Sequence, residues 1–87
     1  MLAGQWFDAQ GNYYDVVKKG NRYSVTEHGA LGQTGTGTAT LSGNVVTLNL
    51  TNILLGRYTL QLELAGDTLR GAMQMMGIPV PIVFNRR

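Results

Sequence analysis

The only histidine of the chain, His28, is a candidate general base because it follows Glu27 directly at the end of a predicted strand. A carboxylate can orient such a base, but catalysis also needs a nucleophile within its reach. The sequence has no cysteine and two serines, Ser24 and Ser42, and neither lies in a Gly-x-Ser-x-Gly motif. Ser42 belongs to a Ser-Gly-Asn turn, where a serine has a conformational role. We therefore expect His28 to be a solvated turn residue.

Paired carboxylates are the second kind of catalytic group to consider, and the acidic residues are Asp8, Asp15, Glu27, Glu63 and Asp67. A glycosidase needs two carboxyl groups that face each other across a cleft. Asp67 lies in a turn and Glu63 on the polar face of its strand, which leaves Asp15 and Glu27 to face each other across a hairpin. No spacing in the sequence requires that arrangement. We therefore expect no enzyme activity and, with one histidine and no cysteine, no metal or other cofactor.

Basic residues gather at one predicted hairpin tip, which contains Lys18, Lys19 and Arg22. Such a cluster can bind a phosphate, an acidic partner or an anionic lipid head group, or it can simply block edge pairing. Single-stranded nucleic acid binds where aromatic side chains stand beside a basic groove, and three tyrosines lie near this tip: Tyr13, Tyr14 and Tyr23. The net charge is only +2, so we expect no nucleic-acid partner. We expect Arg86 and Arg87 at the end of the chain to be solvated.

The elements that must position these residues are strands. The 87 residues include 12 glycines and 2 prolines, and only 14% of them are charged. Turn signals recur at intervals near 8–12 residues, which is typical of an all-β sandwich or barrel. Between them apolar and polar residues alternate, most clearly from Arg57 to Leu64, as in strands with one buried face. We predict one domain over residues 1–87, an antiparallel up-and-down meander of about eight short strands without a helix.

Closure of these strands into a small barrel is expected because closure removes both edges of the sheet. The two prolines near the end of the chain cannot donate ladder hydrogen bonds, so the last strand should have an edge position, a bulge or a late start. Three glycines, Gly35, Gly37 and Gly71, fall on inward faces inside strands. Glycine weakens a strand unless something approaches its backbone closely. We expect the barrel to bend there, or Trp6 or a tyrosine to pack on the bare backbone.

A family resemblance rests on the opening Gly4-Gln5-Trp6-Phe7, followed by Gly11-Asn12-Tyr13, and on the later turns Ser42-Gly43-Asn44 and Ala65-Gly66-Asp67. These motifs resemble those of the calycin group, which contains lipocalins, avidins and small bacterial lipocalin-like domains. The resemblance spans most of the chain. It implies a barrel whose floor is covered by a tryptophan and which can hold an apolar ligand. It does not imply biotin binding, because the further tryptophans of the avidin pocket are missing.

A set of inward aromatic and apolar side chains is the candidate ligand site: Trp6, Tyr23, Tyr58, Leu60, Leu62, Met73, Met75 and Phe84. Methionine adapts to varied partners, and an apolar pocket with a few polar groups is the usual small-molecule site. The sequence thus predicts a non-catalytic binding module for a hydrophobic or amphipathic small molecule or lipid. Alternatively, the same side chains fill the core of a structural or oligomerisation domain, an accessory part of a larger protein.

Further apolar residues have no place inside a small barrel: Phe7, Val17, Val45, Ile53, Leu54, Leu55, Met76, Ile78 and Val83. Exposed apolar patches mark interfaces, so we predict self-association, most simply as a symmetric dimer. No run approaches the roughly 18 apolar residues of a membrane helix, and we expect no membrane span. Met1 directly precedes the first predicted strand, which favours a periplasmic or secreted location if an export signal has been removed.

Overall fold

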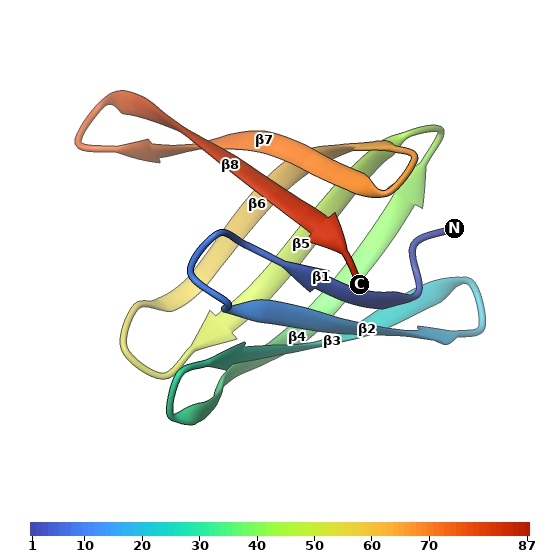
Figure 1. The fold of residues 1–87 in the computed structure, drawn as a ribbon, viewed down its shortest axis with the longest axis horizontal. Coiled ribbons are helices and arrows are strands. Elements are labelled where there is room, and N and C mark those ends of the chain that lie inside the picture. The colour runs from blue at the N-terminus through green and yellow to red at the C-terminus, as the bar shows by residue number, and fades with distance from the viewer.

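Eight antiparallel strands pair with their neighbours in sequence, and the first and last strands pair to close a barrel (Figure 1). The computed structural model describes residues 1–87 except for the side chain of Met75. The strands are β1 (Gly4–Phe7), β2 (Tyr13–Lys19), β3 (Arg22–Gly29), β4 (Gly32–Ser42), β5 (Val45–Asn52), β6 (Gly56–Ala65), β7 (Thr68–Met75) and β8 (Ile78–Arg86). Among the described residues there is no helix long and apolar enough to cross a membrane. The predicted all-β meander of eight strands is confirmed.

The core follows from the alternation of side chains along each strand. In β5 the side chains of Val46, Leu48 and Leu50 are almost fully buried, while those of Asn49 and Thr51 face solvent. The buried hydrophobic residues form one cluster inside the barrel: Leu2, Trp6, Tyr14, Val16, Tyr23, Val25, Ala39, Val46, Leu48, Leu50, Leu60, Leu62, Leu69 and Phe84. Burying one such large side chain contributes about 1.5–3 kcal/mol. The period-two pattern therefore predicted the inward face correctly.

The inward glycines mark places where neighbouring strands approach closely. A Cβ on Gly37 would lie 2.8 Å from the Cα of Leu50 on β5, and one on Gly71 would lie 2.6 Å from the carbonyl oxygen of Gln61 on β6. The nearest atoms belong to adjacent strands rather than to Trp6 or a tyrosine. The expected packing of Trp6 or a tyrosine on these glycines is therefore wrong, and glycine is needed because the neighbouring strands leave no space for a Cβ.

The tip of the β7–β8 hairpin leaves the barrel as a two-stranded arm, which comprises residues 72–81 and extends to the left in Figure 1. Strand β7 pairs with β6 only from Thr68 to Gly71. Strand β8 pairs with β1 only through Asn85 and Arg86, because β1 has four residues and cannot reach further. The two prolines therefore lie where β8 has a single neighbour, which is the edge position expected for residues without a backbone N–H.

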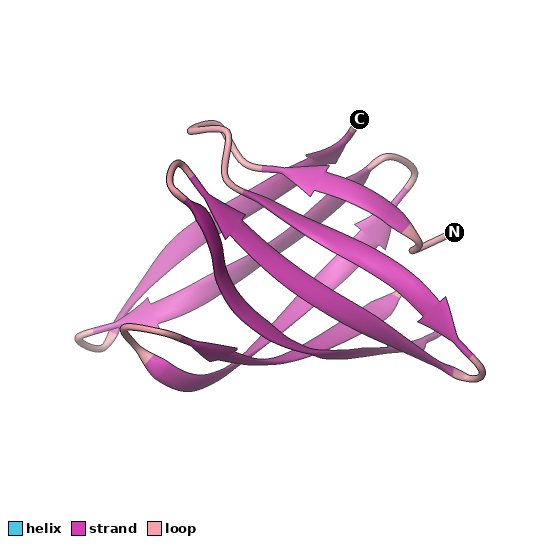
Figure 2. Ribbon diagram, turned by 90° about the horizontal axis from the view of Figure 1, so that it is seen from below, coloured by secondary structure: helices cyan, strands magenta, loops and turns pink.

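One end of the barrel is covered by Trp6. Its indole nitrogen donates to the carbonyl oxygen of Leu2 at 2.8 Å, and the guanidinium of Arg86 lies 4.2 Å from the centre of its ring. Arg86 also donates to Asp67 at 3.1 Å and to the carbonyl oxygen of Ala3 at 2.7 Å. The expectation that Arg86 is solvated is wrong, because its cation covers the face of the buried tryptophan. The turns at residues 8–12, 30–31, 53–55 and 76–77 lie at the opposite end (Figures 1 and 2).

Candidate ligand-binding site

A half-buried carboxylate, that of Glu27, stands inside the barrel near the end opposite Trp6. Glu27 lies two residues beyond Val25 on β3, so both side chains project inward. The sheet register places Glu27 beside Tyr14 of β2 and Gly35 of β4. A Cβ on Gly35 would lie 2.9 Å from Oε1 of Glu27, closer than real contacts allow. The missing side chain of Gly35 therefore makes room for the carboxylate.

Three neutral groups donate hydrogen bonds to this carboxylate. Thr34 Oγ1 and Asn52 Nδ2 donate to Oε1 of Glu27 at 2.9 and 2.6 Å, and the hydroxyl of Tyr58 donates to Oε2. The hydroxyls of Tyr58 and Tyr14 are 3.2 Å apart. The hydroxyl of Tyr58 donates its hydrogen bond to Glu27, so its oxygen accepts a hydrogen bond from the hydroxyl of Tyr14. The lone pairs of the Tyr14 oxygen therefore stay free. The result is a directed chain from Tyr14 through Tyr58 to Glu27.

Tyr14 and Tyr58, the two tyrosines of this hydrogen-bonded series, are held in the neutral form. Burial raises the pKa of Tyr14 to about 12, and the charges of Glu27 and Asp8 add to this rise. Burial and then the hydrogen bond to Glu27 also raise the pKa of Tyr58 well above its usual range. A phenol loses its proton less readily when it is buried and lies beside negative charge. Near neutral pH the two hydroxyls are therefore hydrogen-bond donors rather than bases.

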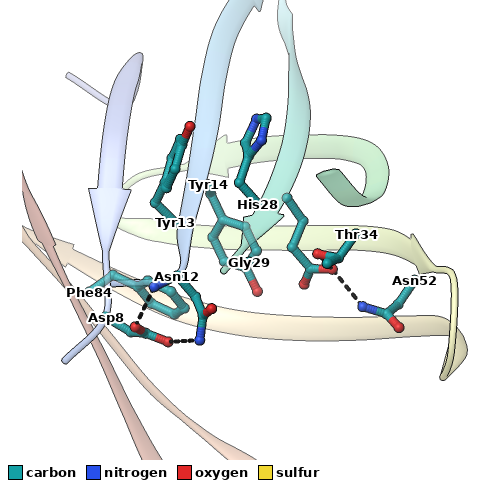
Figure 3. Close-up of a pocket in the computed structure, with 10 residues that line it drawn as sticks. Asp8, Asn12, Tyr13, Tyr14, His28, Gly29, Thr34, Asn52 and Phe84 are labelled. Atoms are coloured by element: carbon teal, nitrogen blue, oxygen red, sulfur yellow. Dashed lines mark hydrogen bonds between the residues drawn. The ribbon is translucent and has the colours of Figure 1, made fainter. Parts of the chain in front are cut away.

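Two adjoining cavities open around this cluster. The smaller, of about 260 Å³, lies between the turn at residues 8–12 and the start of β4, and its lining includes Asn12, Tyr13 and Thr34 (Figure 3). The larger, of about 670 Å³, extends along the inner wall toward β8 and the arm. Asp8, Tyr14, Glu27 and Phe84 line both cavities. The larger volume is within the range of small-molecule sites, which commonly have about 300–1,000 Å³, and the smaller is just below it.

The wall of the larger cavity is apolar and includes Leu60, Met73, Ile82 and Phe84, with Tyr58 at its polar side. Four residues of the predicted ligand set thus line this cavity: Tyr58, Leu60, Met73 and Phe84. Three others, Trp6, Tyr23 and Leu62, lie in the buried core. The side chain of Met75, which completes the predicted set, lies outside the described residues. Ligand binding by any of them stays a prediction.

Apart from Tyr58, the polar residues of the cavity were not in the predicted ligand set. Glu27 was considered only as a catalytic carboxylate, although alternation along β3 could have placed it inside the barrel. Tyr23, Val25 and Glu27 have the same parity, so an inward Val25 implies an inward Glu27. The contributions of Tyr14, Thr34 and Asn52 depend on the register of three separate strand pairs. That register is a property of the closed barrel, and no local pattern shows it.

The two catalytic arrangements considered from the sequence are absent among the described residues. Asp15 pairs with Thr26, and Glu27 pairs with Tyr14, so Asp15 and Glu27 point to opposite faces of the hairpin. His28 is not a solvated turn residue: its ring is half-buried and stacks on Tyr13 with 4.5 Å between ring centres. Figure 3 shows Tyr13 and His28 on the side of the strands away from Tyr14. No group of three or more metal-ligating side chains occurs in the described part of the chain.

Comparisons with protein families, with curated proteins and with solved structures find no match for this chain. A functional conclusion therefore has to come from the geometry of the cavities.

Proposed function

We propose that this protein is a non-catalytic binding module of lipocalin-like form, which holds an amphipathic small molecule in the cavity at the open end of its barrel. The observation that carries the proposal is the lining of the larger cavity. Leu60, Met73 and Phe84 form an apolar wall, and Glu27 with Tyr58 forms a polar cluster beside it. An apolar pocket with a few fixed polar groups is the usual design of a small-molecule site.

The asymmetry of the barrel supports this proposal. The stack of Arg86 on Trp6 covers one end, and the buried core fills the middle. The two cavities around Glu27 lie toward the other end, where β7 and β8 are incompletely paired with their outer neighbours. A ligand would enter there with its apolar part along the inner wall and its polar group at Glu27.

Binding of a neutral apolar dye, N-phenylnaphthylamine, tests the proposal. We expect its fluorescence to rise on titration with the protein, and Met73→Glu to abolish most of that rise because it places a charge on the apolar wall. Gln74→Glu is the matched control, since it adds the same charge to the neighbouring exposed residue. Absence of a fluorescence rise with the folded wild-type protein, or equal binding by both variants, would contradict the proposal.

A second candidate function, a structural or oligomerisation domain, is favoured by the exposed apolar side chains of the turns at the open end. Leu31, Leu54 and Met76 are about as exposed as in an extended chain, and Ile53, Leu55 and Ile78 are largely exposed. Such residues gathered at one end suit contact with another protein surface. The oligomeric state in solution tests this candidate.

A further inference from the structure

The charges that line the two cavities differ in sign from the charge of the whole protein. Asp8 and Glu27 line both cavities and contribute a formal charge of −2, whereas the chain as a whole has +2. Among the described lining residues none is lysine or arginine, although the chain has seven such residues. A cleft lined by one sign of charge with low-dielectric walls attracts ligands of the opposite sign.

The carboxylate of Glu27 has hydrogen-bond donors but no cationic partner among the described residues. Its contacts are the hydroxyls of Thr34 and Tyr58 and the side-chain amide of Asn52, all of them neutral. The ion pair that the structure shows, between Arg86 and Asp67, is at the other end of the barrel. Taking a carboxylate out of water is costly unless a counter-charge accompanies it. The cavity thus lacks one component, a positive charge near Glu27.

Aromatic rings stand around the place where that charge would lie. Tyr14 stacks on Phe84 with 4.7 Å between ring centres, and the hydroxyl of Tyr14 meets that of Tyr58. The free lone pairs of the Tyr14 oxygen can accept from an N–H group. The faces of tyrosine and phenylalanine also attract an ammonium group through cation–π interaction.

We propose that the ligand is an amphipathic organic cation, whose ammonium group lies against Glu27 and Tyr14 and whose apolar part lies along Leu60, Met73 and Phe84. This inference rests on the proposed binding function and specifies its ligand class. An inorganic cation fits less well. A metal ion needs several protein ligands, and no group of three or more metal-ligating side chains occurs among the described residues. An ammonium group needs fewer acceptors, and Oε2 of Glu27 accepts one hydrogen bond, from Tyr58.

A comparison of three ligands with the same alkyl chain tests the sign of the charge. The binding of octylammonium, octanol and octanoate to the wild-type protein is measured by NMR titration of backbone amides. We expect octylammonium to bind about tenfold or more tighter than octanol, because hydrogen bonds to charged groups are the stronger ones, and octanoate to bind weakest. Octanol binding as tightly as octylammonium would overturn the inference but leave the binding function intact. If none of the three binds, the proposed function fails as well.

Substitution of the carboxylate locates the effect. Glu27→Gln keeps the size of the side chain and removes the charge, so we expect it to weaken octylammonium binding about tenfold to a hundredfold and to change octanol binding less than about threefold. Glu63→Gln is the matched control, because it removes one charge from the exposed face of β6. An equal loss of octylammonium binding in both variants would show a long-range charge effect and would contradict the placement of the ammonium group at Glu27. If Glu27→Gln does not fold, the relative affinities of the wild-type protein for the three ligands still test the inference.

Discussion

At the scale of single residues, the site depends on the neutral tyrosines that surround Glu27. Tyr14 is 5% exposed and its hydroxyl contacts Tyr58, which in turn donates to the carboxylate. Ionisation of Tyr14 would place a second negative charge beside Glu27 and remove the proton that it donates. The stability of the open end of the barrel is therefore coupled to the protonation of this residue.

This coupling predicts a loss of stability in alkaline solution. Folding raises the pKa of Tyr14 from 10.0 to about 12, so its contribution is complete below pH 10 and disappears as the pH rises toward about 12. The share of Tyr14 in the fall of the free energy of unfolding should reach about 3 kcal/mol at most. Tyr58, whose pKa is also raised, adds to the total fall, and urea denaturation over this pH range measures it. Tyr14→Phe, which has no group to ionise, should show a smaller fall. An equal fall in both proteins would show that other groups cause it.

At the scale of elements, the path of β4 around the barrel depends on glycines that have no space for a side chain. At Gly37 the backbone of β5 occupies the place of a Cβ, whereas the side chain of the next residue, Thr38, is exposed. We predict that Gly37→Val lowers the free energy of unfolding by about 2–3 kcal/mol and Thr38→Val changes it by less than about 0.5 kcal/mol. Urea denaturation of both variants is the measurement. Similar values for the two would mean that β4 and β5 separate there without cost.

The β7–β8 arm is the element whose hydrogen bonds should open first. Between residues 72 and 81 its two strands pair with each other but not with β6 or β1. Backbone amides exchange with solvent through local openings, which cost least where few contacts must break. We predict that the amides of Ala72 and Gln74 exchange with deuterium faster than those of Leu48 and Leu50 in β5. Because Met73 and Val80 line the cavity, a bound ligand should slow exchange in the arm. Protection of the arm equal to that of β5 would contradict this prediction.

At the scale of the whole molecule, polarity differs between the two ends of the barrel. The turns at the open end expose Leu31, Leu54 and Met76, while basic residues such as Lys18, Lys19 and Arg70 lie toward the covered end. The surplus apolar residues expected on the surface are exposed with the exception of Phe7. Ile53, Leu54, Leu55, Met76 and Ile78 lie at or next to the turns of the open end, whereas Val17 and Val45 lie toward the covered end. The ring of Phe7 is half-buried and stacks on Tyr13.

The predicted dimer can be tested by substitution in the exposed turns of the open end. If the open ends of two molecules meet, light scattering at increasing concentration should show a twofold increase in mass, and Leu54→Asn should prevent it. Leu54 is 89% exposed, so its replacement should leave the fold unchanged. Val17→Asn on the outer face of β2 is the control, and it should not affect the mass. A wild-type protein that stays monomeric at high micromolar concentration would contradict the prediction.

The sequence by itself determined the fold class, the number of strands and the inward face of most of them. These features are local, because side-chain direction alternates along any strand and glycine or asparagine permits the turns between strands. The same local rule could have placed Glu27 inside the barrel beside Val25, but it says nothing of what surrounds the carboxylate.

Only the tertiary structure decided the composition of the site. Tyr14, Thr34, Asn52 and Tyr58 reach Glu27 from four different strands, which the chain brings together over separations of up to 31 residues. Their meeting depends on the stagger of each strand against the next, and a slip of one residue would turn these side chains to the other face. The tertiary structure also separated the predicted ligand set, with Trp6 in the core at the covered end and Met73 at the cavity. Alternation fixes the face on which a residue lies, but closure of the barrel fixes its height along the axis, and that height divides core from cavity.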